Sequence, residues 1–115
     1  MIKKKSAQTL EVRKNMRAGM GEVTIRHYLN KEEINAQCRL CAELIIPPGA
    51  SIGLHEHTQE DEVFIIQQGN AIVLDDGKEV EVEAGDAILT ANAASHTIRN
   101  SGNNNLVVTA IIMQY

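Results

Sequence analysis

The sequence is poor in aromatic residues. Its 115 residues include no Trp, one Phe (Phe64) and two Tyr (Tyr28 and Tyr115). Surfaces that stack single-stranded nucleic acid rely on several aromatic side chains, so the composition argues against such a surface. Hydrophobic residues still make up 43% of the chain, which is typical of a globular protein. Small and branched aliphatic residues must therefore form most of the core.

Clustered positive charge and long apolar runs are also scarce. Eleven Lys and Arg stand against 15 Asp and Glu, for a net charge of −4 with neutral His. The one basic cluster is residues 3–5, so we expect no nucleic-acid partner. No run approaches the roughly 18 apolar residues of a membrane span, and polar residues follow the basic start where a signal peptide would become apolar. We therefore expect a cytoplasmic protein that does not associate with membranes.

Two cysteines, Cys38 and Cys41, have the spacing C-x-x-C. This spacing occurs in redox pairs and in half of a zinc site, but the sequence has no second pair. A redox pair usually opens a helix, which lowers the pKa of the thiol, whereas residues 39–46 are typical of a strand. Residues three apart on a strand point to opposite faces. We expect two free thiols, and a redox role stays open.

Strand patterns dominate the chain. Branched residues and apolar–polar alternation recur between short turns such as Asp75-Asp76-Gly77. The expected strands are 23–28, 38–46, 52–57, 62–68, 71–74, 78–83, 87–90, 95–100 and 106–114. One helical turn is expected at 31–34, with Asn30 as its N-cap. This spacing of turns predicts an all-β sandwich or barrel.

The length of the chain predicts one compact domain. We expect residues 1–20 to form an N-terminal tail and connector, and residues 21–115 to form the domain. The final strand, 106–113, is apolar on both faces, and such a strand needs cover on both sides. One cover is the core, and the other is expected to be a second subunit. The sequence therefore predicts a homodimer.

Three of the four histidines lie near a carboxylate in the expected sheets. His55 and His57 are two apart, so their side chains leave the same strand face. Glu62 follows on the next strand, and His96 lies on a later one. A single His-x-His is more often an exposed pair without a metal, but four such side chains can converge on one ion. Imidazole and carboxylate ligands without thiolate suit Mn, Fe, Ni, Cu or Zn.

The spacing around these residues supports a metal site. A first motif has five defined positions, with five residues between Gly49 and His55, one between His55 and His57, four between His57 and Glu62 and six between Glu62 and Gly69. A second motif contains His96. Gly85 and Asn100 fall in register with His96. On these residues the chain, over about 40–113, resembles a small single-domain member of the cupin superfamily.

The resemblance implies a small antiparallel β-barrel of jelly-roll type, also called a double-stranded β-helix. It also implies one divalent transition metal inside the barrel, held by His55, His57, Glu62 and His96. An octahedral metal with four protein ligands has two further positions for water or a small molecule. The chain departs from the family at 91–93, where Ala-Asn-Ala replaces Pro-x-Gly. Asn92 tolerates left-handed geometry and is expected to shape that turn.

Other residues near the expected site have two interpretations. Parity from Glu62 places Phe64, Ile66 and Gln68 on the ligand face. On the strand 38–46, either Arg39 and Glu43 or Leu40, Ala42 and Leu44 face inward, and the second choice buries more apolar area. Glu60 and Asp61 are expected to form a solvated acidic edge. The loop 16–21 is interpreted as a plain connector, with a lid or an interface as the alternatives.

Two functional hypotheses follow. The first is an enzyme: a metal-dependent dioxygenase, decarboxylase, isomerase or lyase that acts on a small carboxylate or sugar-like molecule. The second is a binding or sensor module that holds a small-molecule ligand at the same site without turnover. The expected inner face offers no strong general base apart from the ligands, so chemistry would depend mainly on the metal. A third class, a purely structural dimeric domain, would leave the site empty, and the sequence leaves this choice open.

Overall fold

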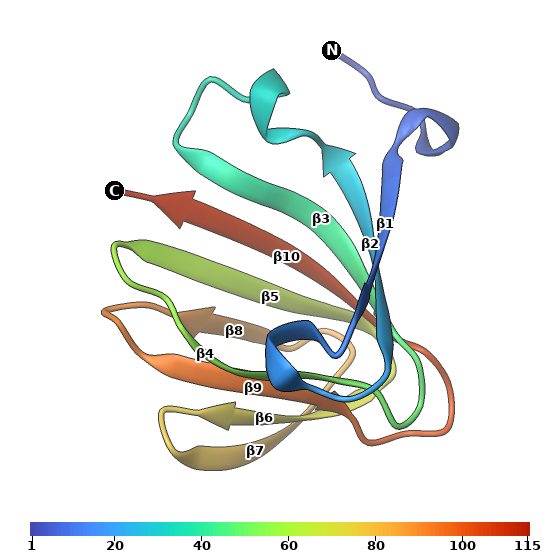
Figure 1. The fold of residues 1–115 in the computed structure, drawn as a ribbon, viewed down its shortest axis with the longest axis vertical. Helices are drawn as coiled ribbons and strands as arrows, with labels where there is room; N and C mark the ends of the chain where they lie inside the picture. Colours follow the sequence, from blue (N-terminus) through green and yellow to red (C-terminus); the bar gives the residue numbers. More distant parts are fainter.

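In the computed structural model of residues 1–115, ten strands form two antiparallel sheets that face each other (Figure 1). The first sheet has six strands in the order β1-β2-β3-β10-β5-β8, and the second has four in the order β4-β9-β6-β7. The first sheet contains β1 (Thr9–Lys14), β2 (Glu22–Leu29), β3 (Cys38–Ile46), β5 (Glu60–Gln68), β8 (Ala87–Thr90) and β10 (Leu106–Gln114). The second contains β4 (Ser51–Glu56), β6 (Asn70–Asp75), β7 (Lys78–Glu83) and β9 (Ser95–Asn100).

The helical segments are three short 3-10 turns: η1 (Lys5–Ala7), η2 (Met16–Ala18) and η3 (Lys31–Glu33). The expected turn after Asn30 is confirmed as η3, where the backbone N–H of Asn30 donates to Glu33 at 2.7 Å. None of these segments has the length and apolar character required to cross a membrane.

The all-β prediction is confirmed, and each of the nine expected strands is present. The expected sandwich or jelly-roll barrel is observed as a β-sandwich of two antiparallel sheets with separate edges, and not as a closed barrel. Facing sheets pack about 10 Å apart, whereas hydrogen-bonded strands lie about 4.8 Å apart. The side chains of the core occupy this gap and keep the edge strands of the two layers from pairing.

The core between the sheets is aliphatic apart from Phe64. Fifteen buried residues form it, and Phe64 is their only aromatic member. On β3, Ala42 and Leu44 point inward, as expected from the larger apolar area that this choice buries. The strand pattern therefore places the outward-facing Glu43 on the opposite side of the sheet.

The segment 1–20, which we expected to be a tail and connector, contains a strand of the larger sheet. β1 pairs antiparallel with β2, with Leu10 opposite Arg26 and Val12 opposite Thr24. The usual pattern is inverted here, because Leu10 and Val12 are each 57% exposed while the charged Glu11 is half-buried. Nε2 of His27 lies 2.8 Å from Glu11 Oε1 and fixes this inner contact. An inverted pattern gives no hydrophobic signal for a strand.

Candidate metal centre

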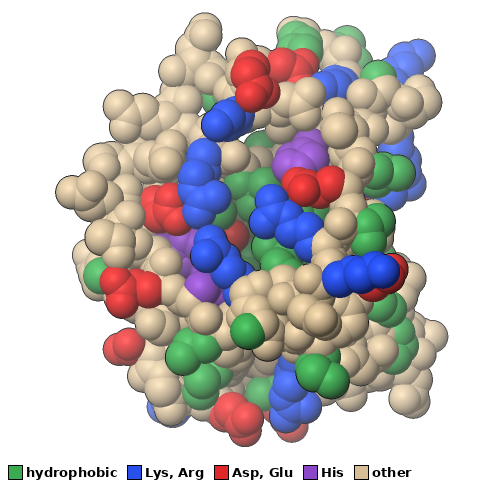
Figure 2. All heavy atoms as spheres, viewed as in Figure 1, with side chains coloured by type: hydrophobic (Ala, Val, Ile, Leu, Met, Phe, Trp, Pro, Cys, Tyr) green, Lys and Arg blue, Asp and Glu red, His purple; other side chains and the backbone are tan.

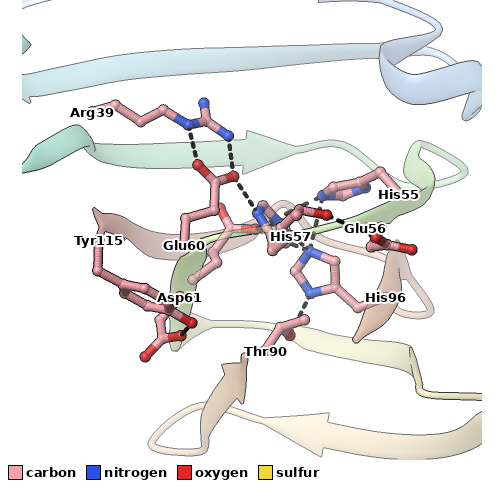
Figure 3. Close-up of polar contacts among 11 residues, drawn as sticks. Arg39, His55, Glu56, His57, Glu60, Asp61, Thr90, His96 and Tyr115 are labelled. Atoms are coloured by element: carbon pink, nitrogen blue, oxygen red, sulfur yellow. Dashed lines mark hydrogen bonds and ion pairs between the residues drawn. The ribbon is translucent and has the colours of Figure 1, made fainter. Parts of the chain in front are cut away.

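The structure brings His55, His57, Glu62 and His96 together between the two sheets (Figure 3). His55 is on β4 and His57 directly follows that strand; Glu62 is on β5 and His96 on β9. His55 is paired with His96 across β4 and β9. One ligand atom from each residue lies within 4.8 Å of the other three. These are the four residues that the sequence assigned to a metal.

The ligand atoms are close neighbours. Nε2 of His96 lies 3.0 Å from Nε2 of His57 and 2.9 Å from Nε2 of His55. Oε1 of Glu62 lies 2.8 Å from Nε2 of His57 and 2.9 Å from Nε2 of His96. His57, Glu62 and His96 are each less than 5% exposed. Four polar groups therefore meet at one point that water barely reaches.

The outer ring nitrogens fix which way the lone pairs point. Nδ1 of His55 donates to the carbonyl of Gly53 at 2.7 Å, and Nδ1 of His57 donates to Oε1 of Glu60 at 2.7 Å. Nδ1 of His96 lies 2.8 Å from the hydroxyl oxygen of Thr90. A neutral imidazole that donates through Nδ1 presents a lone pair at Nε2. Such outer contacts are typical of histidines that bind metals.

The donor set fits a first-row divalent metal. With all three imidazoles neutral and protonated at Nδ1, no hydrogen atom lies between the Nε2 atoms and Glu62, and Oε1 of Glu62 is buried without a hydrogen-bond partner. At metal–ligand bonds of about 2.1 Å, ligands at right angles lie about 3.0 Å apart and tetrahedral ligands about 3.4 Å apart. Four of the observed separations, 2.8–3.0 Å, match the right-angle value. A cation at this point would satisfy the buried oxygen and the lone pairs together.

The charge of the cluster responds to both burial and neighbours. Burial alone would raise the pKa of the Glu62 carboxyl, but the three surrounding imidazoles outweigh it and hold the pKa well below its usual range. Contact with Glu62 raises the pKa of His57. Burial lowers the pKa of His96. Glu62 is thus a carboxylate at neutral pH, as a metal ligand must be.

Glu60 is a buried partner of the cluster, so our expectation of a solvated acidic edge is wrong for this residue. Its exposure is 9%, and it accepts hydrogen bonds from His57 and, through two contacts of 2.7 and 2.6 Å, from Arg39 (Figure 3). The Arg39 guanidinium is the main cause that lowers the pKa of Glu60 to about 2. Parity on β5 places Glu60 on the same face as Glu62. Asp61 points the other way and accepts from the hydroxyl of Tyr115 at 3.0 Å.

Arg39 reaches the cluster because β3 is irregular at this residue. Along the pairing with β10, Ile112 lies opposite Leu40 but Met113 lies opposite Cys38, so Arg39 has no partner. An extra residue of this kind re-aims a side chain. Arg39 and Leu40 therefore both line the cavity described below. The strict alternation that we used to choose between these two residues does not apply at a bulge.

A small cavity of about 70 Å³ opens beside the metal candidates. His55, His57 and Glu62 form one part of its wall, and Phe64 and other apolar residues form another. Three arginines complete the lining: Arg13, Arg17 and Arg39. Figure 2 shows a hollow on this face with apolar side chains inside it and basic, acidic and His side chains around it. Three arginines thus line a cavity of an acidic chain, and two of them, Arg13 and Arg39, are paired with glutamates.

The segment that we interpreted as a plain connector contributes to this cavity through Met16 and Arg17 of η2. Asn15, Arg17 and Ala18 adopt left-handed backbone angles, with φ of 50°, 54° and 62°. Such angles cost energy in residues other than glycine and persist where the surroundings impose them. Here η2 lies against β4, where a Cβ on Gly53 would overlap the carbonyl oxygen of Arg17. A bare Cα at Gly53 therefore allows Arg17 to approach the cavity.

The turn that departs from the cupin pattern keeps His96 in place. Asn92 and Ala93 have left-handed φ values of 55° and 59°, and the N–H of Ala94 donates to the carbonyl of Ala91 at 3.0 Å. The expectation that Asn92 shapes this turn is consistent with its geometry. The carbonyl of Ala94 accepts from the N–H of His57 at 3.3 Å. The turn thus connects the segment before His96 to the segment that holds His57.

Sequence reasoning missed three residues of the site and left one open. Arg13 and Arg17, which line the cavity, lie in the segment expected to be outside the domain. The third, Thr90, contacts Nδ1 of His96 and does not line the cavity; it had no signal apart from its position before the turn. Arg39 was one of two alternatives. Cys38 and Cys41 are free thiols away from the four-residue cluster, and burial raises the pKa of Cys41.

Comparisons with known proteins agree with this geometry. The family model of the cupin domain matches residues 42–112. An oxalate-binding protein of Thermotoga maritima is 42% identical over 113 residues, which cover 98% of this chain and 93% of that protein. A Thermotoga maritima structure described as a predicted oxalate decarboxylase is 41% identical, with a TM-score of 0.95 and complete coverage of both chains. The Cnp3 cupin domain of Schizosaccharomyces pombe shares the fold at 10% identity, with a TM-score of 0.75, covering 93% of this chain and 70% of that one.

Proposed function

The chain belongs to the cupin family, and from this premise we propose that it binds a small dicarboxylate, such as oxalate, at one divalent transition metal. The metal would be held by His55, His57, Glu62 and His96. The observation that carries this proposal is the cavity in which arginines from three different elements face these metal candidates. Figure 2 shows the same face of the molecule.

A metal bound here would supply a Lewis acid with open positions for carboxylate oxygens. Protein side chains around the cavity supply the other contacts that would recognise the ligand. Three imidazoles and one carboxylate leave a net positive charge on a divalent centre. Arg13, Arg17 and Arg39 offer N–H donors across a cavity of about 70 Å³, and Glu11 and Glu60 offset the charges of Arg13 and Arg39. A ligand with a carboxylate at each end can bind the metal with one carboxylate and accept hydrogen bonds from the arginines with the other. A monocarboxylate can make only one of these two contacts.

The cavity suits a ligand of a few non-hydrogen atoms. On the measure by which one water molecule needs about 10–15 Å³, about 70 Å³ holds several water molecules, which is enough for a small dicarboxylate. Phe64 and Leu44 form part of the wall and offer no hydrogen bonds. The specific dicarboxylate is proposed as oxalate because it has the fewest atoms, and because a relative that covers nearly the whole chain is an oxalate-binding protein.

Binding without turnover fits the cavity better than catalysis does. Glu60, the carboxylate outside the four-residue cluster that contacts His57, already accepts hydrogen bonds from Arg39 and His57. It therefore has little freedom to move a proton to or from a ligand. We place the protein among ligand-binding cupins, with a decarboxylase or dioxygenase as the alternative that the same experiment tests.

The experiment is titration calorimetry of the manganese-loaded protein with oxalate, succinate and acetate, after elemental analysis of the metal that co-purifies. We expect oxalate to bind at one equivalent per chain and at least about tenfold more tightly than acetate, which corresponds to about 1.4 kcal/mol. The same mixtures are then assayed for formate and carbon dioxide. Absence of oxalate binding would contradict the proposal, and product formation would replace the binding function with catalysis.

We also propose that the protein is a homodimer through the outer face of the six-stranded sheet. No element of the chain covers this face (Figure 1), yet it carries half-buried aliphatic side chains on three neighbouring strands: Ile45, Val63, Ile65, Val107 and Ile111. An uncovered apolar area of this kind is typical of a contact surface.

The polar groups in the middle of this outer face already have partners. The hydroxyl of Tyr28 donates to Glu43 at 3.3 Å, and Nε of Arg26 donates to Glu43 at 3.3 Å. They can thus be covered without loss of hydrogen bonds. Light scattering should give twice the chain mass for wild type, and Ile111→Glu should give the monomer mass. Ile72→Glu, on the outer face of the other sheet, is the matched control, and a monomeric wild type would contradict the proposal.

A further inference from the structure

Arg39 and Glu60 connect the cavity to a metal candidate. Nε and Nη2 of Arg39 donate to Oε2 and Oε1 of Glu60 at 2.7 and 2.6 Å. The same Oε1 accepts from Nδ1 of His57 at 2.7 Å. One buried carboxylate therefore holds a guanidinium on one side and an imidazole on the other (Figure 3).

We infer that Arg39 is a specificity-determining residue, which recognises the carboxylate of the ligand that is remote from the metal, and that Glu60 is a positioning residue, which fixes Arg39 and His57 in one arrangement. This inference rests on the proposed function for its ligand. It assigns separate tasks to two residues outside the four-residue metal cluster.

Arg39 has N–H groups that are not used by Glu60 and that can donate to a ligand. A guanidinium carries five N–H groups, and the contact with Glu60 engages one on Nε and one on Nη2. The others remain at a residue that lines the cavity together with His57 and Glu62. Because the guanidinium is planar and held at two points, these donors have fixed directions. Fixed donors cost less entropy when a carboxylate binds them.

The side chains of the other two cavity arginines are held less firmly in place. The side chain of Arg13 is 50% exposed and contacts Glu11 through a single hydrogen bond of 3.2 Å. Arg17 forms no salt bridge. The side chain of Arg39 is 35% exposed, and that of its partner Glu60 only 12%. Arg39 is therefore the arginine whose position in the cavity is set before a ligand arrives.

Glu60 ties this position to the orientation of His57. Its carboxylate accepts the Nδ1 proton, which leaves the Nε2 lone pair of His57 directed at the other three metal candidates. A Gln at this position has one carbonyl oxygen and one NH2 group in place of the two carboxylate oxygens. If the carbonyl oxygen replaces Oε1, His57 keeps its acceptor and Nε of Arg39 loses its own; in the opposite orientation His57 and Nη2 of Arg39 lose theirs. Arg39 loses a contact in either case and His57 at best keeps a neutral acceptor, so ligand selectivity and metal affinity should both change in Glu60→Gln.

The first test compares oxalate with oxamate, which has nearly the same shape but an amide in place of one carboxylate. Manganese-loaded wild type, Arg39→Met, Arg39→Lys and Arg99→Met are titrated with each compound. Arg99→Met removes an arginine that also lies near a glutamate, but on the other sheet and outside the cavity, and it should keep the wild-type affinities. We expect Arg39→Met to lose at least about tenfold in oxalate affinity with a smaller change for oxamate. Arg39→Lys should fall between it and wild type.

The second test is independent of the ligand. Imidazole ¹⁵N NMR of the metal-free protein at a pH where His57 is neutral should show the Nδ1–H form in wild type and a larger share of the Nε2–H form in Glu60→Gln. Manganese affinity in Glu60→Gln should fall about 10- to 100-fold. Unchanged tautomer and unchanged manganese affinity would overturn the positioning role.

The outcomes separate this inference from the proposed function. If wild type binds oxalate and Arg39→Met keeps the wild-type ratio of oxalate to oxamate affinity, the role of Arg39 is wrong and the proposed function stands. If manganese-loaded wild type binds no oxalate, the proposed function is wrong and the role of Arg39 falls with it. The NMR and manganese measurements still decide the role of Glu60.

Discussion

The Nε2 atoms of His55 and His96 lie 2.9 Å apart on directly paired residues of β4 and β9. Nδ1 of His55 donates to a carbonyl, so its Nε2 carries a lone pair when the ring is neutral. When the neutral His96 also carries its proton on Nδ1, towards the hydroxyl of Thr90, two lone pairs meet at this distance beside a buried carboxylate and repel one another unless a cation lies among them. The centre is therefore built for a positive charge, which either a proton or a metal ion can provide.

Replacing His57 with Ala should remove metal binding. The change deletes one Nε2 ligand and leaves Glu60 without its contact to the cluster. We expect manganese affinity to fall at least about 100-fold, more than for loss of an outer contact alone. Elemental analysis after dialysis measures the bound metal per chain. His27→Ala is the control, since His27 contacts Glu11 at the sheet edge; equal metal contents in the two variants would contradict the assignment.

Removal of the metal should lower the melting temperature. A metal that binds only the folded chain at 100 times its dissociation constant adds about 2.7 kcal/mol of stability. For a chain of 115 residues this corresponds to a fall of about 10 °C on treatment with a chelator. The chain has no Trp, so circular dichroism is the suitable probe. A melting temperature that does not depend on added manganese would count against the site.

The metal-free protein should lose stability in acid through Glu60. The pKa of Glu60 is lowered from 4.5 to about 2, so the folded chain holds this proton less tightly than the unfolded chain. The resulting stability is fully present above about pH 4.5 and is lost as the pH falls towards about 2. Urea unfolding should show that wild type exceeds Glu60→Gln by on the order of 2 kcal/mol at neutral pH. This difference should shrink below pH 4.5, and a constant difference would show that the ionised carboxylate is not its source.

Much of the fold could be predicted from the sequence, because most strands keep their apolar side chains inside. β10 and β5 alternate buried and half-buried residues, and their bounds agree closely with the expected ones. β1 was missed for the opposite reason: its apolar Leu10 and Val12 face outward, while Glu11 contacts His27 inside. The separation of the two sheets depends on how the edges pack, which no local pattern reports.

The four metal candidates could be predicted from the sequence because their spacing is local to two short segments. The residues around them could not be predicted in this way. Parity on β5 would have placed Glu60 beside Glu62, but an acidic run is usually solvated. Its partner Arg39 reaches it only through a bulge. Arg17 reaches the cavity from a left-handed turn, and such backbone angles in residues other than glycine have no reliable sequence signal.

Gly53→Ala should separate the cavity rim from the metal centre. The carbonyl of Gly53 accepts from Nδ1 of His55, and an added methyl group does not remove that carbonyl. The methyl group would instead overlap the backbone of Arg17 and approach Gly19, so η2 must move away from β4. Overpacking of this kind costs about 1–3 kcal/mol. Because Arg17 lines the cavity, oxalate affinity should fall while manganese affinity changes little.

The matched control for this variant is Gly102→Ala. An added Cβ there would meet its nearest neighbours only at 3.7 Å, which is ordinary contact. Calorimetry with manganese and then oxalate measures both affinities on the same samples, and circular dichroism gives the loss of stability. If Gly53→Ala binds oxalate as tightly as Gly102→Ala does, η2 plays no part in holding the ligand. If it loses manganese instead, then the position of His55, and not that of Arg17, is what Gly53 protects.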